Sequence, residues 1–485
     1  MKILFATQDV DFYTPLGLMQ ISAMAKQRGD ETYLTVLSRE DILDKIKKIK
    51  PDIVAYSCTT GEHKYYANIN KKIKSYSRNI FTIAGGPHAT FFPEFIEQTD
   101  LDAICIGEGE YPFQELLERL ERGKDISGLE NIIVKGGKLN GLKPLIQNLD
   151  ALPFPDRELF YRSNKSGKEQ PTVMNFMTSR GCPYNCTYCF NHSFNKTYHG
   201  QRPIRKHSVD YAINEILDTK EKFNFKFIRF MDDIFVFKED DWFKEFCTRY
   251  PKEVGLPFYV HSRFDLITPT IVDSLKNAGC KAIHMSIEST NPKIRKEILK
   301  RNMSDAEIIK GAKYCQDKKI PIVVNTMLGL PTSTLKDDIN AVDFSIKAGV
   351  PIPEFPIYQP YPRTDLGELC VKNKWFDGDM SKIDMYGFTH RSILSCFTER
   401  EKNAQVNISL LGPLVVRHPS LRNIVINHLI YLPTNKLFNQ IYTIEKMMVY
   451  PSKVYKLKYS LKERLGVIRK SLRLEKVKRS KLMEK

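Results

Sequence analysis

The sequence lacks the long apolar runs and the leader that would place it in or across a membrane. No stretch reaches the roughly 18 uninterrupted apolar residues that a spanning helix needs. The chain opens with MKILFAT, a pattern of a buried strand rather than of a basic and apolar signal. The ten cysteines stand singly apart from one cluster, as is typical of a reducing compartment. We expect a cytoplasmic protein whose membrane contact, if any, is peripheral.

Basic charge is plentiful but does not follow a nucleic-acid-binding pattern. The formal net charge is +17, and residues 452–485 alone hold 13 lysines and arginines against three glutamates. Aromatic residues are not interleaved with the basic ones. We therefore expect no nucleic-acid partner. With 485 residues and 42% hydrophobic content, the chain is long enough for two or three domains.

The basic tail carries its own periodicity. From Val454 to Leu472, apolar residues recur every three or four positions among lysines and arginines. A helix of this kind can lie at an anionic inner membrane surface. It can equally pack on its own protein and leave its charged face in solvent, and the pattern does not separate these alternatives.

One stretch, TSRGCPYNCTYCFN, places three cysteines close together. Structural zinc is normally held by four ligands in two separated pairs, whereas three cysteines can hold an iron–sulfur cube and leave one iron open. The spacing indicates a reactive cluster at Cys182, Cys186 and Cys189. The alternatives are an incomplete zinc knuckle and coincidental reduced cysteines.

This Cys-x3-Cys-x2-Cys motif, with aromatic Tyr188 before the last cysteine, resembles the signature of radical S-adenosylmethionine (SAM) enzymes. The resemblance implies a 4Fe–4S cluster on the three cysteines, with its open iron chelating SAM and Tyr188 near that cofactor. It also implies cleavage of SAM to a 5′-deoxyadenosyl radical, which abstracts hydrogen from an unactivated position.

The first third of the chain alternates short apolar runs with helical periodicity, which predicts a doubly wound parallel sheet. Ligands of such sheets bind beyond the carboxyl ends of the strands, where glycine allows close approach. Three loops there carry glycine, at residues 57–61, 85–90 and 107–110. Taken singly, each loop can also be only a tight turn.

Together with the PLGL stretch near the start, these loops resemble the cobalamin-binding domain fused to one large class of radical SAM enzymes. The match covers about residues 1–140 of this sequence. Under this resemblance the cobalamin-binding residues are Leu16, Ser57, Thr59, Thr60, Gly85, Gly86, Gly107, Glu108 and Gly109.

The wider cobalamin-binding superfamily often supplies a histidine to cobalt through Asp-x-His-x-x-Gly, and no such motif occurs here. His88 follows Gly-Gly-Pro, and we interpret it as a loop histidine rather than a cobalt ligand. We hypothesise that the cobalt then lacks a strong lower ligand.

Two closely spaced prolines, Pro153 and Pro155, stiffen a connection and exclude a helix between them, so we place a linker here. Six strand–helix units follow, which predict a partial barrel with its site at the carboxyl ends of the strands. The expected fold is α/β. We assign residues 1–145 to a Rossmann-like cobalamin-binding domain, 146–170 to the linker, 171–370 to a (β/α)6 radical SAM barrel, and 371–485 to a helical C-terminal region with the basic tail. Within the C-terminal region we expect helices at 407–416, 420–432 and 437–449.

Barrel residues that the resemblance places beside SAM lie at predicted strand ends. Asp232 and Asp233 stand where the family receives the SAM ammonium group; they can also be a capping or surface pair, and the sequence does not say which one faces inward. The remaining SAM-binding candidates are Glu288, the cations Arg263 and Arg301, which can equally be surface residues, and Asn325 and Gly329 from the segment that packs on adenine.

The predicted protein is a cobalamin-dependent radical SAM enzyme, most simply a methyltransferase acting on an unactivated carbon or phosphorus of a small-molecule, lipid or natural-product substrate. The alternatives are a cyclase, oxidoreductase or rearrangement enzyme without net methyl transfer, and a non-catalytic cobalamin sensor. A flavodoxin- or ferredoxin-like external electron donor is expected. The individual catalytic residues, the substrate and the role of the C-terminal region are left open.

Overall fold

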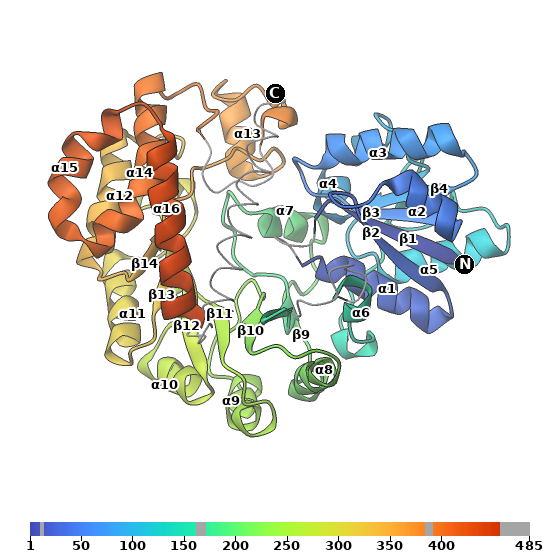
Figure 1. Cartoon of the computed structure of the whole chain (residues 1–485), viewed down its shortest axis with the longest axis horizontal. Helices are drawn as coiled ribbons and strands as arrows, with labels where there is room; N and C mark the ends of the chain where they lie inside the picture. Colours follow the sequence, from blue (N-terminus) through green and yellow to red (C-terminus); the bar gives the residue numbers. More distant parts are fainter. Residues whose placement is uncertain (10–13, 162–170, 384–390, 456–485) are drawn as a thin grey trace.

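The computed structural model describes residues 1–9, 14–161, 171–383 and 391–455. Two α/β bodies lie side by side, and helices of the C-terminal region cover the side of the second body that faces away from the first (Figure 1). Most of the predicted tail helix, from residue 456 onward, lies outside the described residues. No described helix is long and apolar enough to cross a membrane.

The first body is a six-stranded sheet in the order β2-β1-β3-β4-β5-β6. Its first five strands run parallel and the sixth is antiparallel. Ile3 and Phe5 point into one core and Leu4 and Ala6 into the other, so helices cover both faces, which explains why the strands read as continuous apolar runs. The strands are β1 (Lys2–Thr7), β2 (Glu31–Val36), β3 (Ile53–Ser57), β4 (Phe81–Gly85), β5 (Ala103–Cys105) and β6 (Ile132–Val134).

The chain leaves β1 first toward β2 and later toward β3 on the opposite side, and such a switch point is where doubly wound sheets bind ligands. The flanking helices are α1 (Leu16–Arg28), α2 (Ile42–Ile49), α3 (His63–Tyr76) and α5 (Glu110–Glu121). One expectation needs correction: Gly85 to His88 is not a plain turn, because the short helix α4 (Gly86–Phe91) begins directly after β4.

The second body is a six-stranded parallel sheet in the sequential order β7-β10-β11-β12-β13-β14, which confirms the predicted partial barrel. Its strands are β7 (Val173–Phe176), β10 (Phe227–Phe230), β11 (Phe258–His261), β12 (Cys280–Glu288), β13 (Ile322–Thr326) and β14 (Ile352–Glu354). Its outer helices are α8 (Val209–Lys222), α9 (Asp241–Glu253), α10 (Pro269–Asn277), α11 (Asp305–Asp317) and α12 (Leu335–Lys347).

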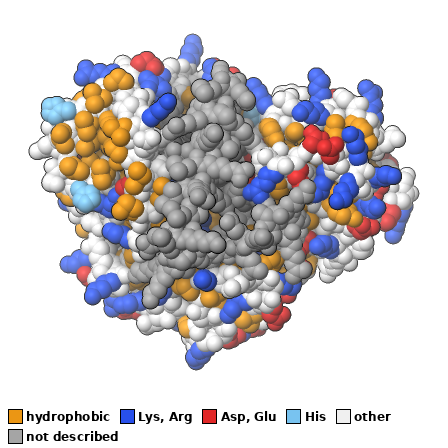
Figure 2. Space-filling model, viewed as in Figure 1, with side chains coloured by type: hydrophobic (Ala, Val, Ile, Leu, Met, Phe, Trp, Pro, Cys, Tyr) orange, Lys and Arg blue, Asp and Glu red, His pale blue; other side chains and the backbone are white. Residues whose placement is uncertain are grey.

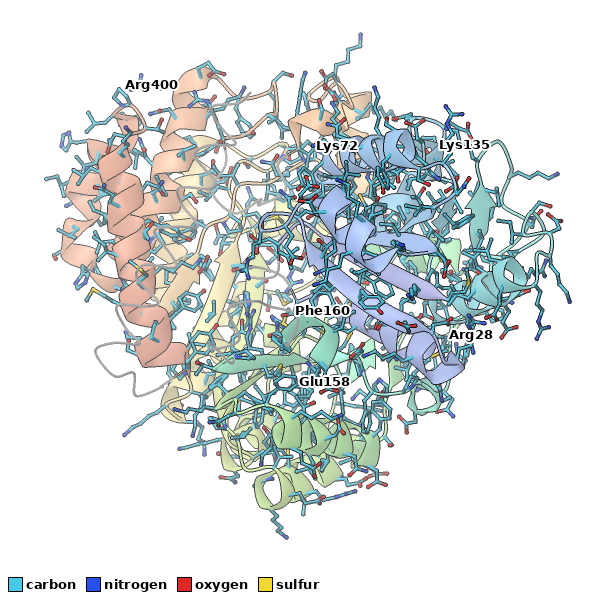
Figure 3. The ribbon with its side chains drawn as sticks, turned by 45° about the vertical axis from the view of Figure 1, so that its right-hand side comes forward. Arg28, Lys72, Lys135, Glu158, Phe160 and Arg400 are labelled. Atoms are coloured by element: carbon cyan, nitrogen blue, oxygen red, sulfur yellow. The ribbon has the colours of Figure 1, made fainter. Side chains whose placement is uncertain are left out.

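The linker packs on both bodies. After Pro155 it forms α6 (Arg157–Tyr161), whose Leu159 and Phe160 are buried in the core of the first sheet, while Tyr161 also packs against the barrel core. Phe160 lies near the junction of the two bodies in Figure 3. The exact domain boundaries stay a prediction; the two sheets themselves span residues 2–134 and 173–354.

The C-terminal region is helical as predicted, but its elements differ. The helix expected at 407–416 already begins at Glu399, as α14 (Glu399–Arg417), and the single helix expected at 420–432 is broken into short pieces around α15 (Arg422–Asn427). Helix α16 (Lys436–Val449) continues into the π-helical η8 (Tyr450–Tyr455). Val449 and Val454 pack against inward-facing Phe227 and Tyr259, so this segment fills one end of the barrel.

Candidate cofactor site

The cysteine loop leaves the barrel through the short strand β8 (Ser179–Arg180) and turns at Gly181. Gly181 has φ +87°, and an added Cβ would lie 2.0 Å from the Pro203 carbonyl oxygen, so only glycine fits. The loop is then held by its own backbone, since the Cys189 N–H donates to the Cys186 carbonyl (3.1 Å). Helix α7 (Phe190–Thr197) starts directly after Cys189.

The three thiols are near enough for their charges to interact. Burial raises the pKa of Cys182 to about 11 and that of Cys189 to about 12, so iron must displace protons to bind. Among the described residues no three Cys, His, Asp or Glu side chains form a ready-made metal centre. Three neighbouring sulfur donors on one loop nevertheless suit a 4Fe–4S cluster with an open iron.

Two adjacent aspartates follow β10, and the structure separates them. Asp232 is 1% exposed and accepts hydrogen bonds from the N–H of Thr178 (3.0 Å) and from the hydroxyls of Thr178 (2.8 Å) and Ser179 (2.5 Å). It therefore anchors the strand end that leads into the cysteine loop. Asp233 is exposed, accepts from the Gly181 N–H and lies near the cysteines. Of the two, Asp233 has the accessible carboxylate, and its contact with the SAM ammonium group remains a prediction.

A buried polar network joins Glu288 to the cysteine loop. The Tyr188 hydroxyl donates to Glu288 (3.0 Å), and Arg301 donates to the Tyr188 oxygen (3.3 Å), to the Ser286 carbonyl (2.8 Å) and to Cys186. Burial raises the pKa of Glu288, and Arg301 opposes that rise. The Arg301 Nε has no partner among the described residues. Tyr188, Glu288 and Arg301, predicted separately, are thus brought together.

The backbone at Glu288 is strained, with φ +65° and a shift of strand register next to it. Positive φ in a non-glycine residue costs on the order of 1–3 kcal/mol and concentrates at functional sites. The strain is consistent with a binding role for Glu288, which remains a prediction.

The guanidinium of Arg263 makes most of its contacts with neighbouring side chains. It donates two hydrogen bonds to Asp265, both 3.0 Å, and its guanidinium lies 3.7 Å from the centre of the Tyr184 ring. It is near enough to Cys182 and Glu288 to influence their pKa values. Arg263 is therefore not a surface cation, and its contact with SAM remains a prediction.

The late barrel residues show contacts within the chain. Asn325 lies beside His284 and acts to raise its pKa, against the larger lowering by burial. Gly329 has φ +62°, its N–H donates to Asp338 (2.9 Å), and an added Cβ would meet Gln405 of α14 at 3.0 Å. Glycine at position 329 is therefore explained by the close contact with α14. Packing of Gly329 on adenine remains a prediction.

A cavity of about 520 Å³ lies between the carboxyl ends of the first sheet and the barrel. Of the nine predicted cobalamin residues, seven line it: Leu16, Ser57, Gly85, Gly86, Gly107, Glu108 and Gly109. Thr59 and Thr60 do not; they hydrogen-bond to Glu62 (2.6 Å) and His88 (3.2 Å). The barrel contributes Asn175, Met177, Arg229 and Met231, so one space is shared by both sheets.

The glycines of this cavity differ in what they accommodate. At Gly17 an added Cβ meets nothing within 4 Å, so this wall is open to a large ligand. At Gly86 it would lie 2.8 Å from the Ser57 hydroxyl, and at Gly107 it would lie 1.9 Å from the Tyr198 hydroxyl. Gly107 therefore allows the close approach of Tyr198, the residue that follows α7, and not only of a cofactor.

His88 is part of the protein core. It is 1% exposed, stacks on His63 with ring centres 4.3 Å apart, and does not line the cavity. Burial lowers the pKa of His88 to about 3. The expectation that it is a loop residue is wrong, because it belongs to α4. The cavity at the switch point is open-walled, as a large cofactor requires, and the first sheet supplies no histidine to its described lining. His207 of the barrel lines it and hydrogen-bonds to Asp150 (3.1 Å), so the lack of a strong lower ligand stays a prediction.

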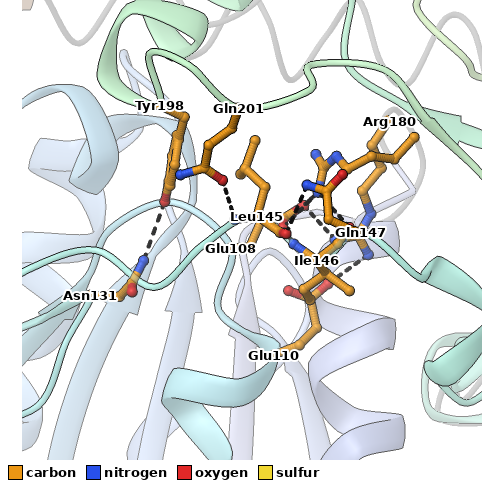
Figure 4. Close-up of polar contacts among 10 residues, drawn as sticks. Glu108, Glu110, Asn131, Leu145, Ile146, Gln147, Arg180, Tyr198 and Gln201 are labelled. Atoms are coloured by element: carbon orange, nitrogen blue, oxygen red, sulfur yellow. Dashed lines mark hydrogen bonds and ion pairs between the residues drawn. The ribbon is translucent and has the colours of Figure 1, made fainter.

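Glu108 joins the two bodies through an ion-pair network that sequence reasoning missed (Figure 4). Its carboxylate accepts from Arg180 (2.9 Å), Arg205 (2.8 Å) and the Ile146 N–H (2.8 Å), while Arg180 also pairs with Glu110 (2.6 Å). Arg180 is two positions before Cys182, so the first sheet orients the cysteine loop. The partners of Glu108 are far away in the sequence, and no local pattern indicates them.

Comparisons with known proteins match both α/β bodies of the chain. The chain matches the family models "Radical SAM superfamily" over residues 176–344 and "B12 binding domain" over residues 2–117. It is 30% identical over 370 residues to an uncharacterized methyltransferase of Pyrococcus horikoshii, covering 74% of this chain and 79% of that one. It is 23% identical over 406 residues to cytidylyl-2-hydroxyethylphosphonate methyltransferase of Streptomyces wedmorensis, covering 75% and 74%.

Solved structures share the fold. The cobalamin-dependent SAM radical enzyme OxsB, with aqua-cobalamin and SAM bound, gives a TM-score of 0.67 at 18% identity and covers 98% of this chain and 75% of that one. The radical SAM methyltransferase TsrM of Kitasatospora setae gives 0.64 at 15% identity and covers 76% of each. The cofactors of the chain are accordingly a 4Fe–4S cluster, SAM and cobalamin. The chain belongs to the radical SAM superfamily, in the branch whose members carry a B12 binding domain.

Proposed function

We propose that this enzyme transfers a methyl group to an unactivated carbon or phosphorus centre of a small-molecule, lipid or natural-product substrate. The carrying observation is the shared cavity, which connects the glycine-containing edge of the first sheet with barrel residues beside the cysteine loop. When bound, the cluster and SAM supply the radical that abstracts hydrogen, and cobalamin supplies the methyl group. Two named methyltransferases among the relatives support this reading.

The residues of the chain itself bind and orient the cofactors. We assign cluster ligation to Cys182, Cys186 and Cys189. Arg301 holds Tyr188 and Glu288 in place, and we assign these two residues to the part of the site where SAM binds. Asp233 binds the ammonium group of SAM. The network is buried, so it excludes water from the place where a reactive radical forms.

The test is product analysis after anaerobic reconstitution, with Cys186→Ala as the matched inactive control. We expect S-adenosylhomocysteine and 5′-deoxyadenosine to appear together when substrate is supplied in cell extract. If 5′-deoxyadenosine forms alone, the chemistry is a cyclisation, oxidation or rearrangement. If cobalamin binds and SAM is not cleaved reductively, the chain is a cobalamin sensor and the proposal is wrong.

We also propose that an external one-electron donor of the flavodoxin or ferredoxin kind serves the enzyme. Reductive cleavage of SAM takes up an electron, and a net charge of +17 favours association with an acidic protein. Activity driven by reduced flavodoxin should fall steeply as salt rises, whereas activity driven by a small chemical reductant should not. Equal salt dependence of the two would contradict a charge-guided donor.

We further propose a peripheral contact with an anionic membrane through the C-terminal region. Figure 2 shows apolar side chains gathered over α15. Of the exposed large apolar residues that the structure describes, seven fall within 421–448: Leu421, Ile424, Tyr431, Leu432, Leu437, Ile444 and Met448. Such clustering is typical of an interaction surface, and the basic tail follows it.

Co-sedimentation with anionic liposomes tests this contact. We expect binding to weaken in a chain that ends at Tyr455, which keeps the segment packed in the barrel end, and in the double variant Leu437→Asn, Met448→Asn. The control is Tyr76→Asn, which removes an exposed apolar residue from the first body. Identical binding of all forms would exclude the membrane contact.

A further inference from the structure

The inner surface of the barrel has two levels of different chemistry. At the lower level, Phe227, Tyr259, Ala282, Val323 and Ile352 pack with Val449 and Val454 of the C-terminal segment. One inward-facing position further along each strand, the residues are polar: Asn175, Arg229, His261, His284, Asn325 and Glu354. An apolar floor thus carries a polar layer that faces the site.

The one carboxylate of this layer is already neutralised. Glu354 pairs with Lys446 (2.8 Å) and also accepts hydrogen bonds from Tyr442 (3.4 Å) and Tyr450. His284 is hydrogen-bonded through Nδ1 to Tyr259 (2.6 Å). Negative charge in the layer is therefore not available to Arg229.

Arg229 is half-buried, and its side chain makes no hydrogen bond or ion pair among the described residues. Its guanidinium lies 5.6 Å from the centre of the Tyr259 ring, which is its contact with the layer. The other two arginines of the shared cavity are neutralised: Arg157 by Glu215 (2.6 Å), and Arg180 by Glu108 and Glu110. A guanidinium withdrawn from bulk water without a counter-charge is unfavourable, and its planar donors match a carboxylate or phosphate.

Two more nitrogen atoms of the layer lack partners. His261 Nδ1 and His284 Nε2 are buried and make no hydrogen bond within the described chain. The two rings lie 5.2 Å apart, and both are close enough to Arg229 for its charge to lower their pKa values, after the larger effect of burial. Arg229 itself lines the shared cavity, together with Asn175 and Met231.

The position of Arg229 suits one end of a substrate. Arg229 lies within β10, and Asp233 comes three residues after that strand ends, so Arg229 lies deeper in the barrel than Asp233 and at most about 14 Å from it along the chain. A molecule whose charged end meets Arg229 therefore extends upward toward the residues that we assign to SAM. The closed floor prevents it from sinking deeper.

We propose that Arg229 binds an anionic group of the substrate, a carboxylate or a phosphate, with the free nitrogens of His261 and His284 as further hydrogen-bonding partners. The inference rests on the proposed function and narrows its substrate class to acids. It assigns Arg229 to substrate and not to cobalamin.

Anion binding is tested directly on the protein loaded with its cofactors. Wild type, Arg229→Gln and Arg122→Gln are titrated with inorganic phosphate and, in parallel, with acetate, which separates a phosphate site from a carboxylate site. Arg122 is an exposed arginine of the first body, so its variant controls for unspecific binding to a basic protein. We expect about a tenfold or larger loss of affinity for one anion in Arg229→Gln only, which corresponds to about 1.4 kcal/mol. Equal affinities in all three proteins would overturn the proposal.

Two further measurements keep the assignment falsifiable. The visible absorbance of bound cobalamin should be unchanged in Arg229→Gln; loss of cobalamin would show that Arg229 serves that cofactor. Extract is then incubated with SAM that carries a radiolabelled methyl group, and the labelled product is passed over an anion exchanger. Retention supports the proposal, and a labelled product that passes through overturns it while methyl transfer stands. If no product is labelled, the proposed function fails and the anion titration alone decides the role of Arg229.

Discussion

Replacing Glu108 by glutamine tests whether the first sheet holds the cysteine loop. The side chain of Glu108 is 13% exposed and that of Arg205 is 3% exposed, so this ion pair is largely shielded from solvent. Glutamine keeps one acceptor oxygen but removes the charge that faces Arg180 and Arg205. Breaking a buried charge pair costs about 3–5 kcal/mol. Because glutamine retains part of the hydrogen bonding, we expect a loss of stability of about 3 kcal/mol.

The assay is equilibrium urea denaturation of the apo chain, with Glu121→Gln as the matched control. Glu121 also pairs with an arginine, Arg28, at 2.7 Å, but its side chain is 52% exposed (Figure 3 labels Arg28). An exposed pair contributes at most about 1 kcal/mol. If the two variants lose the same stability, the network does not hold the two bodies together and the reasoning is refuted.

The dependence on pH gives a second measurement. Burial acts to raise the pKa of Glu108, but Arg180 and Arg205 outweigh it, so the pKa lies below its ordinary value. A lowered folded-state pKa gives stability that is present above the unfolded pKa of about 4.3 and is lost as pH falls through the folded pKa. The difference in unfolding free energy between wild type and Glu108→Gln should therefore shrink in acid.

Three further outcomes follow from the site. Cys182→Ala, Cys186→Ala and Cys189→Ala should each lower iron bound after reconstitution, whereas Cys247→Ala, outside the loop, should leave it unchanged. Gly17→Leu should change the stability of the apo chain by no more than about 1 kcal/mol, because the new side chain enters open space, and should weaken cobalamin binding. Gly86→Ala should destabilise the apo chain by about 1–3 kcal/mol, because the backbone of Gly86 has φ +87°. The lowered pKa of His88 makes wild type lose up to about 1.4 kcal/mol per pH unit as pH falls below about 6.5, and His88→Asn should show a shallower slope in urea denaturation.

Much of the fold can be predicted from local pattern. Alternating apolar runs and helical periods require only neighbours in sequence, and both parallel sheets appear where these patterns occur. The cysteine motif is likewise local, because its three donors lie on one loop. The C-terminal region was harder, since the breaks around Arg422–Asn427 leave no clear gap in apolar periodicity.

Pairings across the fold could not be read in this way. Glu108 and Arg205 are 97 positions apart and meet only when both bodies have formed. The adjacent Asp232 and Asp233 look equivalent in sequence. Only the fold shows that Asp232 is the one hydrogen-bonded to Thr178, at the end of a strand more than 50 residues away. The free charge of Arg229 is visible only once every carboxylate near it has been assigned to another partner.

The contact between Gly107 and Tyr198 has a consequence for how such enzymes can be recombined. The Tyr198 hydroxyl occupies the place of a Gly107 side chain and accepts a hydrogen bond from Asn131 (3.3 Å). A chimera that exchanges residues 1–145 for those of a relative would bring a foreign surface to Tyr198, Arg180 and Arg205. Exchange of residues 1–145 between these enzymes should therefore succeed when the contacting barrel residues are exchanged together with them.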